Sequence, residues 1–280
     1  METTDWQALL ILDACRADYF IDCYPDPEAI GLPIPPKSEI KTVLSQGRDT
    51  LSWMLKAFPV VAKKHPAVYT ANPQTTVQIN ARYPTTPVIN IWEKAWCRLT
   101  SKNIPSVHPW AVTGYVLGSD WYMMCARKIV VVYIQPHFPA IGHTPLAMGQ
   151  WQTTSNDYSR ACRHELVRPE KAYKRGTITL KSLRRAYADN VREVMRAALH
   201  LACHIKGKVV ITSDHGESLG EIDEKLNAPM FGHSDRWTRM DHVLRPVPWL
   251  EVDCSVLDEA NVNGTRDEIT KQRLKDLGYM

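Results

Sequence analysis

Residues 208–221 read KVVITSDHGESLGE and join a buried-looking strand to a run of polar residues. Residues 209–212 are apolar or β-branched, as expected of a strand that is covered on both faces. Asp214 and His215 follow at once, although both are poor strand formers and costly to bury without partners. Such an abrupt change of chemistry at a strand end is typical of a functional site.

Similar short runs of strand-forming residues recur along the chain. We predict six strands, over residues 8–12, 67–70, 88–91, 129–134, 209–212 and 248–252. Several of these runs are apolar at successive positions, which indicates strands with helices on both faces. A mainly parallel central sheet is therefore expected.

Helical patterns separate the predicted strands. The clearest covers residues 181–205, where apolar residues recur every three or four positions and Gly207 ends the pattern. Shorter helices are expected over residues 51–58, 111–117 and 266–277. The polar stretch 148–176 shows no clear period, and we interpret it as a loop or irregular insertion beside the site. The alternation predicts one α/β domain over residues 1–280.

The composition limits the class of protein. The 280 residues are 44% apolar with a net charge of +4, as in an ordinary globular protein. The basic residues are dispersed, so nucleic acid binding is not expected, although local basic clusters would suit an anionic substrate. Seven widely spread cysteines without a C-x-x-C pair indicate neither a disulfide framework nor a thiolate zinc site.

Membrane insertion and secretion are not indicated by the sequence. No apolar run approaches the roughly 20 residues that a bilayer span requires. The N-terminal region lacks the basic start and apolar middle of a signal peptide. We therefore expect a soluble, cytoplasmic chain without a transmembrane segment, whose oligomeric state the sequence does not determine.

Polar side chains follow three of the predicted strands. Asp13 ends the first strand, His137 follows the fourth, and Asp214 with His215 ends the fifth. Ligands of such folds gather where parallel strands end. Two carboxylates and an imidazole at one sheet edge suit a divalent metal ion.

Two further histidines and a hydroxyl extend this hypothesis. His143 and His233 each follow a glycine that lets the backbone turn tightly, which suggests a common pocket. Thr50 stands at the start of a predicted helix, where free N–H groups favour an anion, and it is the leading candidate nucleophile. Ser45 and Ser52 are the alternatives.

Two arginines lie near these residues in the sequence. Arg16 and Arg48 are candidates for binding the oxygen atoms of an anionic substrate. Each is equally compatible with an ordinary surface role.

The segment DHGESLGE at 214–221, followed by GH at 232–233, resembles a signature of the alkaline phosphatase superfamily. The likeness is greatest to the phosphoethanolamine transferase and lipoteichoic acid synthase branch and its sulfatase-like relatives. Other segments resemble short archaeal sulfatase-like proteins in matching order over nearly the whole chain: LILDACRADYF, SQGRDTLSWM, YTANP, VVVYIQPHFPAIGH, YADNV, VPWLEVD and RLKDLGYM. This resemblance implies a three-layer sandwich with a mainly parallel central sheet between helices.

The resemblance also implies roles for the site residues. Asp13, Asp214 and His215 would bind the principal metal, and Thr50 would be the nucleophile in contact with it. Three histidines would hold the anionic group, protonate a leaving oxygen or complete a second metal site, namely His137, His143 and His233. Zinc is the preferred ion, with manganese, magnesium or calcium as alternatives, and one or two ions are expected.

One departure separates the chain from formylglycine sulfatases. Their modified cysteine lies in a C-x-P/A-x-R pattern, whereas Cys15 begins CRADY, with Tyr19 where arginine is required. We therefore predict a metal-dependent hydrolase or transferase of phosphate esters. Its substrate would be an anionic small molecule, a lipid head group or a glycan. The alternatives are a sulfate-ester hydrolase and a non-catalytic descendant that binds anions or glycans.

Overall fold

The structure is a computed structural model that describes residues 5–119, 128–148, 166–253 and 275. Its centre is a seven-stranded sheet with the strand order β2-β11-β8-β1-β7-β3-β4. The strands are β1 (Ala8–Leu12), β2 (Lys41–Leu44), β3 (Ala67–Thr70), β4 (Val88–Asn90), β7 (Ile129–Tyr133), β8 (Lys208–Thr212) and β11 (Pro246–Asp253).

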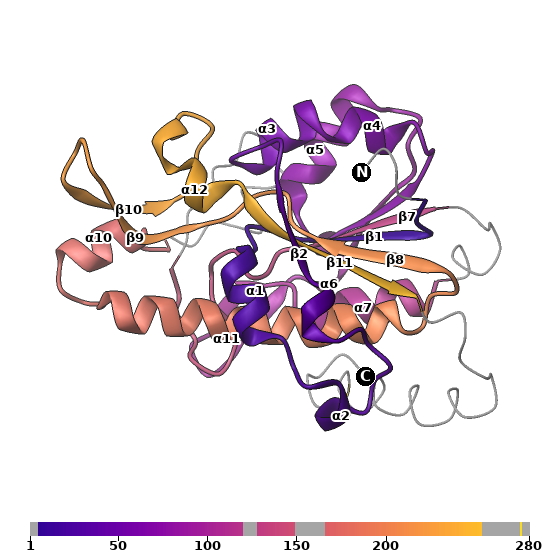
Figure 1. Cartoon of the computed structure of the whole chain (residues 1–280), viewed down its shortest axis with the longest axis horizontal. Coiled ribbons are helices and arrows are strands. Elements are labelled where there is room, and N and C mark those ends of the chain that lie inside the picture. Colours follow the sequence, from indigo (N-terminus) through magenta and orange to yellow (C-terminus); the bar gives the residue numbers. More distant parts are fainter. Residues whose placement is uncertain (1–4, 120–127, 149–165, 254–274, 276–280) are drawn as a thin grey trace.

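Helices cover both faces of the sheet (Figure 1). One face holds α3 (Thr50–Lys56), α4 (Phe58–Ala62) and α5 (Pro73–Arg82). The other holds α1 (Ala17–Cys23), α6 (Ile91–Ala95), α7 (Pro109–Leu117) and the long α11 (Leu180–Ala202). The result is the expected three-layer α/β sandwich.

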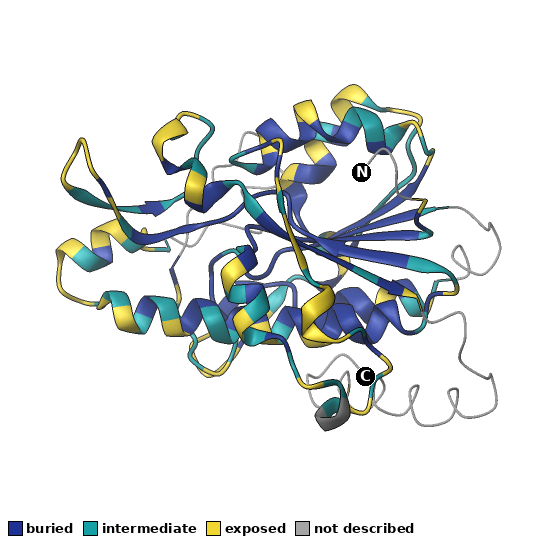
Figure 2. Ribbon diagram, in the orientation of Figure 1, coloured by how far each residue is buried: buried dark blue, intermediate teal, exposed yellow. Residues whose placement is uncertain are grey.

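The strand residues alternate between two apolar cores. On β1, Leu10 and Leu12 pack toward α1, α7 and α11, whereas Leu9 and Ile11 pack toward α3 and α4. All five β1 residues are buried, and so is every residue of β3 and β7 (Figure 2). This double burial explains why the strands read as continuous apolar runs in the sequence.

Five neighbouring strands run parallel, from β8 through β1, β7 and β3 to β4. In this register Leu10 lies opposite Val131 on one side and Ile211 on the other. The residues that follow β1, β7 and β8 therefore emerge at the same edge. The last strand, β11, is antiparallel to both β8 and β2, so the sheet is mainly but not wholly parallel.

Smaller elements complete the fold. A hairpin of β9 (Ser218–Asp223) and β10 (Ala228–Gly232) extends beyond the edge at which β1, β7 and β8 end and contacts α10 (Pro169–Lys174). The remaining elements are α2 (Pro27–Ile30), η1 (Lys37–Glu39), β5 (Cys97–Leu99), β6 (Ile104–Ser106), η2 (Thr238–Met240) and α12 (Asp241–Leu244). Among the described helices, none combines the length and apolar character that a membrane crossing requires.

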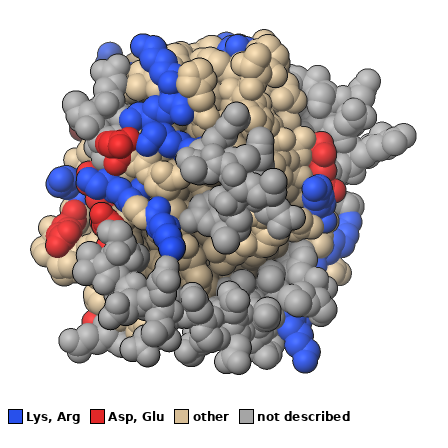
Figure 3. Space-filling view, turned by 90° about the vertical axis from the view of Figure 1, so that its right-hand side faces the viewer, with Lys and Arg blue, Asp and Glu red and all other residues tan. Residues whose placement is uncertain are grey.

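At the opposite end, where the strands begin, basic side chains lie beside acidic ones (Figure 3). Lys128 pairs with Asp5 at 2.6 Å, and Lys208 pairs with Glu251 at 2.9 Å. Part of the positive charge counted in the sequence is therefore used in local ion pairs at this end.

All six predicted strands are present, with ends that differ by two residues or fewer from the prediction. The sequence pattern missed β2, whose residues are mostly exposed, and the four strands of the two hairpins. The predicted helix over 266–277 lies outside the described residues except for Lys275. Of the stretch 148–176, residues 149–165 also lie outside them, and residues 169–174 form α10 rather than a loop.

Candidate metal centre

Asp13 stands directly after β1 at the edge where the parallel strands end. Its backbone N–H donates to the carbonyl of Tyr133 on the neighbouring β7, which holds Asp13 in line with the sheet. The side-chain Oδ2 accepts a hydrogen bond of 2.7 Å from Nδ2 of Asn72. The other oxygen, Oδ1, is buried and has no hydrogen-bond partner within the described structure.

Asp214 follows β8 and faces Asp13. Its Oδ1 accepts hydrogen bonds from the backbone N–H groups of Ala14, at 3.1 Å, and His215, at 3.0 Å. Burial raises the pKa values of the Asp13 and Asp214 carboxyl groups, and the proximity of Asp214 raises that of Asp13 further. Two buried carboxyl groups of this kind are destabilised in their ionised form unless a positive charge joins them.

His215 completes the first group of ligands. Its Nδ1 lies 2.8 Å from the carbonyl of Gly216, which assigns the ring hydrogen to Nδ1 and the lone pair to Nε2. Nε2 lies 3.6 Å from Oδ1 of Asp13 and 3.4 Å from Oδ2 of Asp214. Burial lowers the pKa of His215 well below its ordinary value, so the ring is neutral, as a metal ligand must be.

Gly216 allows this geometry because its backbone is packed tightly. A Cβ atom at this position would lie 2.3 Å from the carbonyl oxygen of Val243. The Gly216 N–H also donates to the carbonyl of Leu244 at 2.7 Å. A larger residue would displace the chain that fixes His215.

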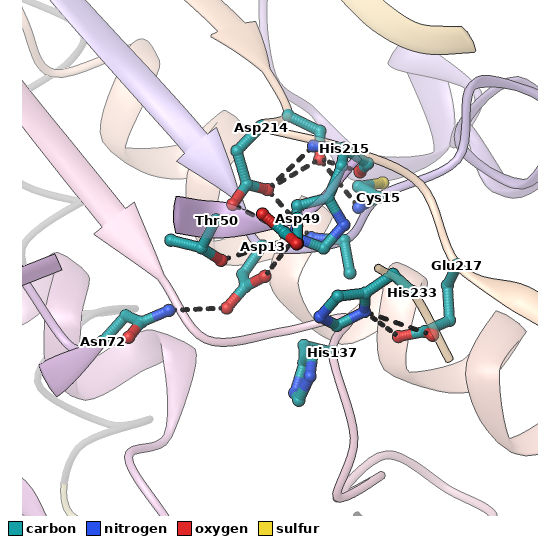
Figure 4. A network of polar contacts seen from close by, with 12 residues as sticks. Asp13, Cys15, Asp49, Thr50, Asn72, His137, Asp214, His215, Glu217 and His233 are labelled. Atoms are coloured by element: carbon teal, nitrogen blue, oxygen red, sulfur yellow. Dashed lines mark hydrogen bonds and ion pairs between the residues drawn. The ribbon is translucent and has the colours of Figure 1, made fainter. Parts of the chain in front are cut away.

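Thr50 is the first residue of α3 and lies beside the same group. Its Oγ1 is 3.4 Å from Nε2 of His215, and its hydroxyl acts to lower the pKa of Asp214. Asp49 caps α3 by accepting a 2.7 Å hydrogen bond from the N–H of Ser52. Figure 4 shows the side chains of Thr50, Asp13, Asp214 and His215 pointing toward one another.

The two alternative nucleophiles have structural roles instead. The Ser52 hydroxyl completes the capping box of α3 by bonding with the backbone of Asp49. The Ser45 hydroxyl donates to the backbone carbonyl of Asp214. Thr50 is the hydroxyl that faces the ligand atoms.

A second group of ligands lies next to the first. His137, Glu217 and His233 each offer one ligand atom, and these atoms lie within 4.8 Å of one another. The same separation holds for the atoms of Asp13, Asp214 and His215. The ring of His233 joins the two groups, with its centroid 4.2 Å from that of His215 and 5.2 Å from that of His137.

In the second group, the Glu217 carboxylate and the His233 ring stabilise each other's charged form. Burial acts to lower the pKa of His233, but the Glu217 carboxylate, 3.3 Å from its Nδ1, outweighs this and raises it. Burial likewise acts to raise the pKa of Glu217, and His233 outweighs it and lowers that pKa. Burial, followed by the charge of His233, lowers the pKa of His137. Of His137, His215 and His233, the last therefore holds a proton most readily.

Asp13 of the first group and all three residues of the second group line one cavity of about 540 Å³, whereas Asp214 and His215 are buried and do not line it. Thr50, Asp13 and His233 line its inner part, together with Glu217 and His137. Its size falls within the range of about 300–1,000 Å³ that is typical of small-molecule sites. The cavity therefore connects the candidate nucleophile with space for a substrate.

Three of the residues that the sequence suggested for substrate binding do not line this cavity. His143 is exposed and does not line it. Arg16 pairs with Asp18 at 2.6 Å and with Glu221 at 2.5 Å. Arg48 pairs with Asp241 and Asp235, and these hydrogen bonds raise its pKa. Both guanidinium groups are thus engaged with carboxylates, and neither lines the cavity.

Sequence reasoning missed three residues that shape the site. Glu217 lies in the quoted segment DHGESLGE, and Asn72 lies in YTANP, so both were within recognised motifs without an assigned role. Asp49 immediately precedes Thr50, and its Oδ2 accepts from the N–H of Asp235 and thereby ties α3 to the segment after His233. Only the folded chain shows these contacts.

The first group fits a divalent metal ion. It offers the partnerless Asp13 Oδ1, Asp214 Oδ2 and the lone pair of His215 Nε2, with the Thr50 hydroxyl beside them. Two hard oxygens, one imidazole nitrogen and a hydroxyl form a donor set suited to zinc and also acceptable to manganese. Positive charge at this point would compensate the two buried carboxylates.

No protein-family model and no curated protein sequence matches the chain. Solved structures do match. The soluble domain of lipooligosaccharide phosphoethanolamine transferase A from Neisseria meningitidis is similar with a TM-score of 0.53 and 13% identity, over 95% of this chain and 80% of that one. The C-terminal periplasmic domain of a phosphoethanolamine transferase from Campylobacter jejuni gives a TM-score of 0.52 and 11% identity, over 97% and 84% of the two chains.

The integral membrane form of the Neisseria enzyme is also similar, with a TM-score of 0.52 and 13% identity over 95% of this chain. The match covers 50% of that membrane protein, so the chain spans half of its length. At these identities the likeness concerns the fold. The chain has the alkaline-phosphatase-like fold that the resemblance implied.

Proposed function

We propose that the chain is a metal-dependent phosphoric-ester hydrolase or phosphotransferase with Thr50 as its nucleophile. The observation that supports this most directly is the position of the Thr50 hydroxyl. It lies 3.4 Å from His215 Nε2, acts to lower the pKa of Asp214 and lines the cavity. A nucleophile in contact with ligand atoms and open to substrate is what transfer of a phosphoryl group requires.

Asp13, Asp214 and His215 would hold the ion, with the Thr50 hydroxyl as a further ligand. When bound, a divalent ion supplies positive charge that lowers the pKa of a neighbouring hydroxyl and stabilises negative charge on a phosphoryl group. Asn72 fixes the Asp13 carboxylate through its 2.7 Å hydrogen bond. The backbone N–H groups of Ala14 and His215 fix Asp214 in the same way.

The Thr50 hydroxyl would release its proton to water in the cavity, and Oγ1 would then form a bond to phosphorus while the bond from phosphorus to the leaving oxygen breaks. His233 is suited to give the leaving oxygen a proton, because Glu217 raises its pKa. Burial lowers the pKa of His137 and keeps its ring neutral. Its ring lies beside that of His233, on the side away from His215, and would orient the phosphoryl group from there. Water or an acceptor alcohol would release the phosphoryl group from Thr50 and regenerate the hydroxyl.

With His137 and His233 acting on the substrate, the site would hold one ion in each chain. His137, Glu217 and His233 would instead hold a second ion if two ions bind. Zinc is the ion we propose, because an imidazole nitrogen joins the two carboxylates in the principal group. A titration of the metal-free protein with zinc distinguishes the two stoichiometries.

The substrate class is proposed from the fold and from the cavity. The similar Neisseria protein is named as a lipooligosaccharide phosphoethanolamine transferase, so a phosphorylated lipid head group is one candidate here. A small anionic ester or a phosphorylated glycan is equally compatible with the cavity. A cytoplasmic location, expected from the sequence, stays a prediction.

Two alternatives to phosphate-ester chemistry would use the same site, namely sulfate-ester hydrolysis and anion binding without turnover. Sulfate esters share the tetrahedral anionic geometry and would use the same ligands. A descendant that binds anions without turnover would be expected to have scattered or blocked site residues, whereas here Asp13, Thr50 and His215 converge beside an open cavity.

The test is turnover of p-nitrophenyl phosphate, bis(p-nitrophenyl) phosphate and p-nitrophenyl sulfate by zinc-loaded protein. We expect turnover of at least one phosphate ester, little of the sulfate, and a loss of at least about 10²-fold in Thr50→Ala with metal content retained. The control is Thr42→Ala, which removes an exposed threonine on the edge strand β2. Equal rates in wild type and Thr50→Ala would exclude the proposed nucleophile.

A further inference from the structure

The cavity is larger than a phosphoryl group alone requires. Its volume is about 540 Å³, whereas a phosphoryl group is only a few times larger than a water molecule, whose share of liquid volume is about 30 Å³. The outer wall comes from two segments distant in the sequence, the start of α10 and the residues between β10 and η2. The part of the substrate beyond the phosphoryl group would lie against this outer wall.

Two arginines lie in the outer wall, one on each segment. Arg168 precedes α10, and Arg236 lies between β10 and η2. Both line the cavity and both are exposed. Across residues 5–119, 128–148 and 166–253, neither guanidinium forms an ion pair, whereas Arg16 and Arg48 are each paired with two carboxylates.

Nearby acidic groups do not neutralise this pair of arginines. Glu170 lines the same wall, but its carboxylate lies 2.5 Å from Nζ of Lys174. Asp49 also lines the cavity, and both of its oxygens accept backbone hydrogen bonds, from Ser52 and from Asp235. The outer wall therefore has two guanidinium groups available for an anion.

We propose that Arg168 and Arg236 form a subsite for a second anionic group, located on the part of the substrate that leaves during the reaction. The preferred substrate class is then a phosphate ester whose leaving group bears its own carboxylate or phosphate. Guanidinium groups suit both anions because their N–H donors match the spacing of two oxygens. This inference rests on the proposed function, because the phosphoryl group is taken to occupy the inner part of the cavity. Trp237 and Phe231, which also line the cavity, would pack against the apolar carbons between the two anionic groups.

The test uses two phosphonates that cannot be hydrolysed and differ only at the far end. Propylphosphonate ends in a methyl group, and 3-phosphonopropionate ends in a carboxylate. Calorimetry would compare their binding to the zinc-loaded full chain. We expect 3-phosphonopropionate to bind roughly fivefold more tightly to wild type, the effect of two exposed charge pairs together. The preference should shrink as salt is raised, because exposed ion pairs are screened.

Substitution of Arg168 and Arg236 tests whether these two residues cause the preference for 3-phosphonopropionate. The double variant Arg168→Gln with Arg236→Gln should bind both phosphonates with equal affinity. Arg196→Gln is the matched control, because Arg196 is an exposed arginine of α11 that does not line the cavity. It should keep the wild-type preference. Replacing 3-phosphonopropionate by 1,2-ethylenediphosphonate, which keeps two methylene groups between the anionic groups, distinguishes a carboxylate from a phosphonate as the favoured second anion.

Three results would overturn the subsite: equal affinity of wild type for the two phosphonates, a preference that survives in the double variant, or no binding of either compound. Turnover of p-nitrophenyl phosphate on the same samples tests the proposed function separately. Turnover without an anion preference rejects the subsite alone. An arginine-dependent preference without turnover supports Arg168 and Arg236 as a pair that binds an anion and rejects the proposed catalysis.

Discussion

Nε2 of His215 lies 3.6 Å from Oδ1 of Asp13, although the two residues follow different strands, β8 and β1. That oxygen is buried and accepts no hydrogen bond within the described structure. Burial and the neighbouring Asp214 raise the pKa of Asp13, so the ionised carboxylate is unstable by itself. A shared cation explains why such a costly arrangement is present.

Asp13→Asn should therefore remove most of the zinc affinity. The amide keeps the size of the side chain but removes the negative charge. Changing a residue that only hydrogen bonds to a metal ligand lowers metal affinity by roughly 10–100-fold, and we expect the zinc affinity of this variant to fall by more than that. Calorimetric titration with zinc measures it. Asp22→Asn, a change at an exposed position on α1, should bind zinc as wild type does. Equal affinities for the Asp13 variant and wild type would remove Asp13 from the ligand set.

Asn72→Ser tests whether the hydrogen bond from Asn72 positions the Asp13 carboxylate for zinc binding. Asn72 donates to Asp13 Oδ2 at 2.7 Å and also caps α5 by accepting from the N–H of Gln74. Serine retains capping ability but is too short to reach Asp13. We expect an affinity for zinc about 10-fold weaker with a nearly unchanged melting temperature. A large loss of thermal stability with unchanged affinity would show a purely structural role.

Zinc affinity should rise with pH. Burial raises the pKa values of Asp13 and Asp214 in the metal-free chain, so these groups retain protons that an incoming ion must displace. His215, whose pKa burial lowers, is already neutral and releases none. Calorimetry in buffers with different ionisation enthalpies should detect protons released on binding. An affinity that is flat across the acidic and neutral range would contradict the raised carboxyl pKa values.

Glu217→Gln should lower the pKa of His233. In wild type the Glu217 carboxylate outweighs the effect of burial and raises this pKa, and the neutral amide removes that contribution. NMR titration of the metal-free protein should show the His233 midpoint moving to lower pH. Glu221→Gln, which changes a carboxylate paired with Arg16, should leave the midpoint in place. A midpoint that does not move in Glu217→Gln would show that the carboxylate does not act on His233.

Asp49→Ala should cost about 1 kcal/mol of unfolding free energy, the usual effect of losing an N-cap. Burial acts to raise the pKa of Asp49, but hydrogen bonds from Ser52 outweigh it and lower the pKa. Because the folded-state pKa is depressed, the stabilising contribution of the charge is present above the unfolded-state pKa. It is lost as the pH falls through the folded-state pKa.

Denaturant unfolding at neutral and acidic pH checks this prediction. The gap between wild type and Asp49→Ala should narrow as the pH falls. Asp49→Asn retains the acceptor oxygen of the cap and should lie closer to wild type at neutral pH. A gap that is constant across this pH range would mean that the charge of Asp49 contributes nothing.

Much of the sheet could be predicted because burial on two faces makes its strands continuously apolar. The run from Ala8 to Leu12 was predicted to the residue for this reason, and so was Ala67 to Thr70. The edge strand β2 was missed because its residues are mostly exposed and show no apolar run. The β9–β10 hairpin was missed because Asp214, His215 and Glu217 dominate the pattern just before it. Tertiary contacts rather than local preference define these elements.

The candidate site was predictable to the extent that it follows strand ends. Asp13, Asp214 and His215 stand directly after parallel strands, and the fold brings such positions together. Arg16 and Arg48 were chosen by proximity in sequence, but partners distant in sequence, Glu221 and Asp241, engage their charges. Arg168 and Arg236 gave no sequence signal because their shared position at the cavity depends on the packing of α10 near β10.

The central claim is that the Thr50 hydroxyl attacks phosphorus beside the ion held by Asp13, Asp214 and His215. The most direct test is to quench zinc-loaded protein during turnover of a phosphate ester and map phosphorylated residues by peptide mass spectrometry. We expect a phosphoryl group on Thr50 that appears only with zinc and substrate and is absent when His215 is replaced by alanine. Sustained turnover with no phosphoryl group on Thr50, and an undiminished rate in Thr50→Ala, would contradict the claim.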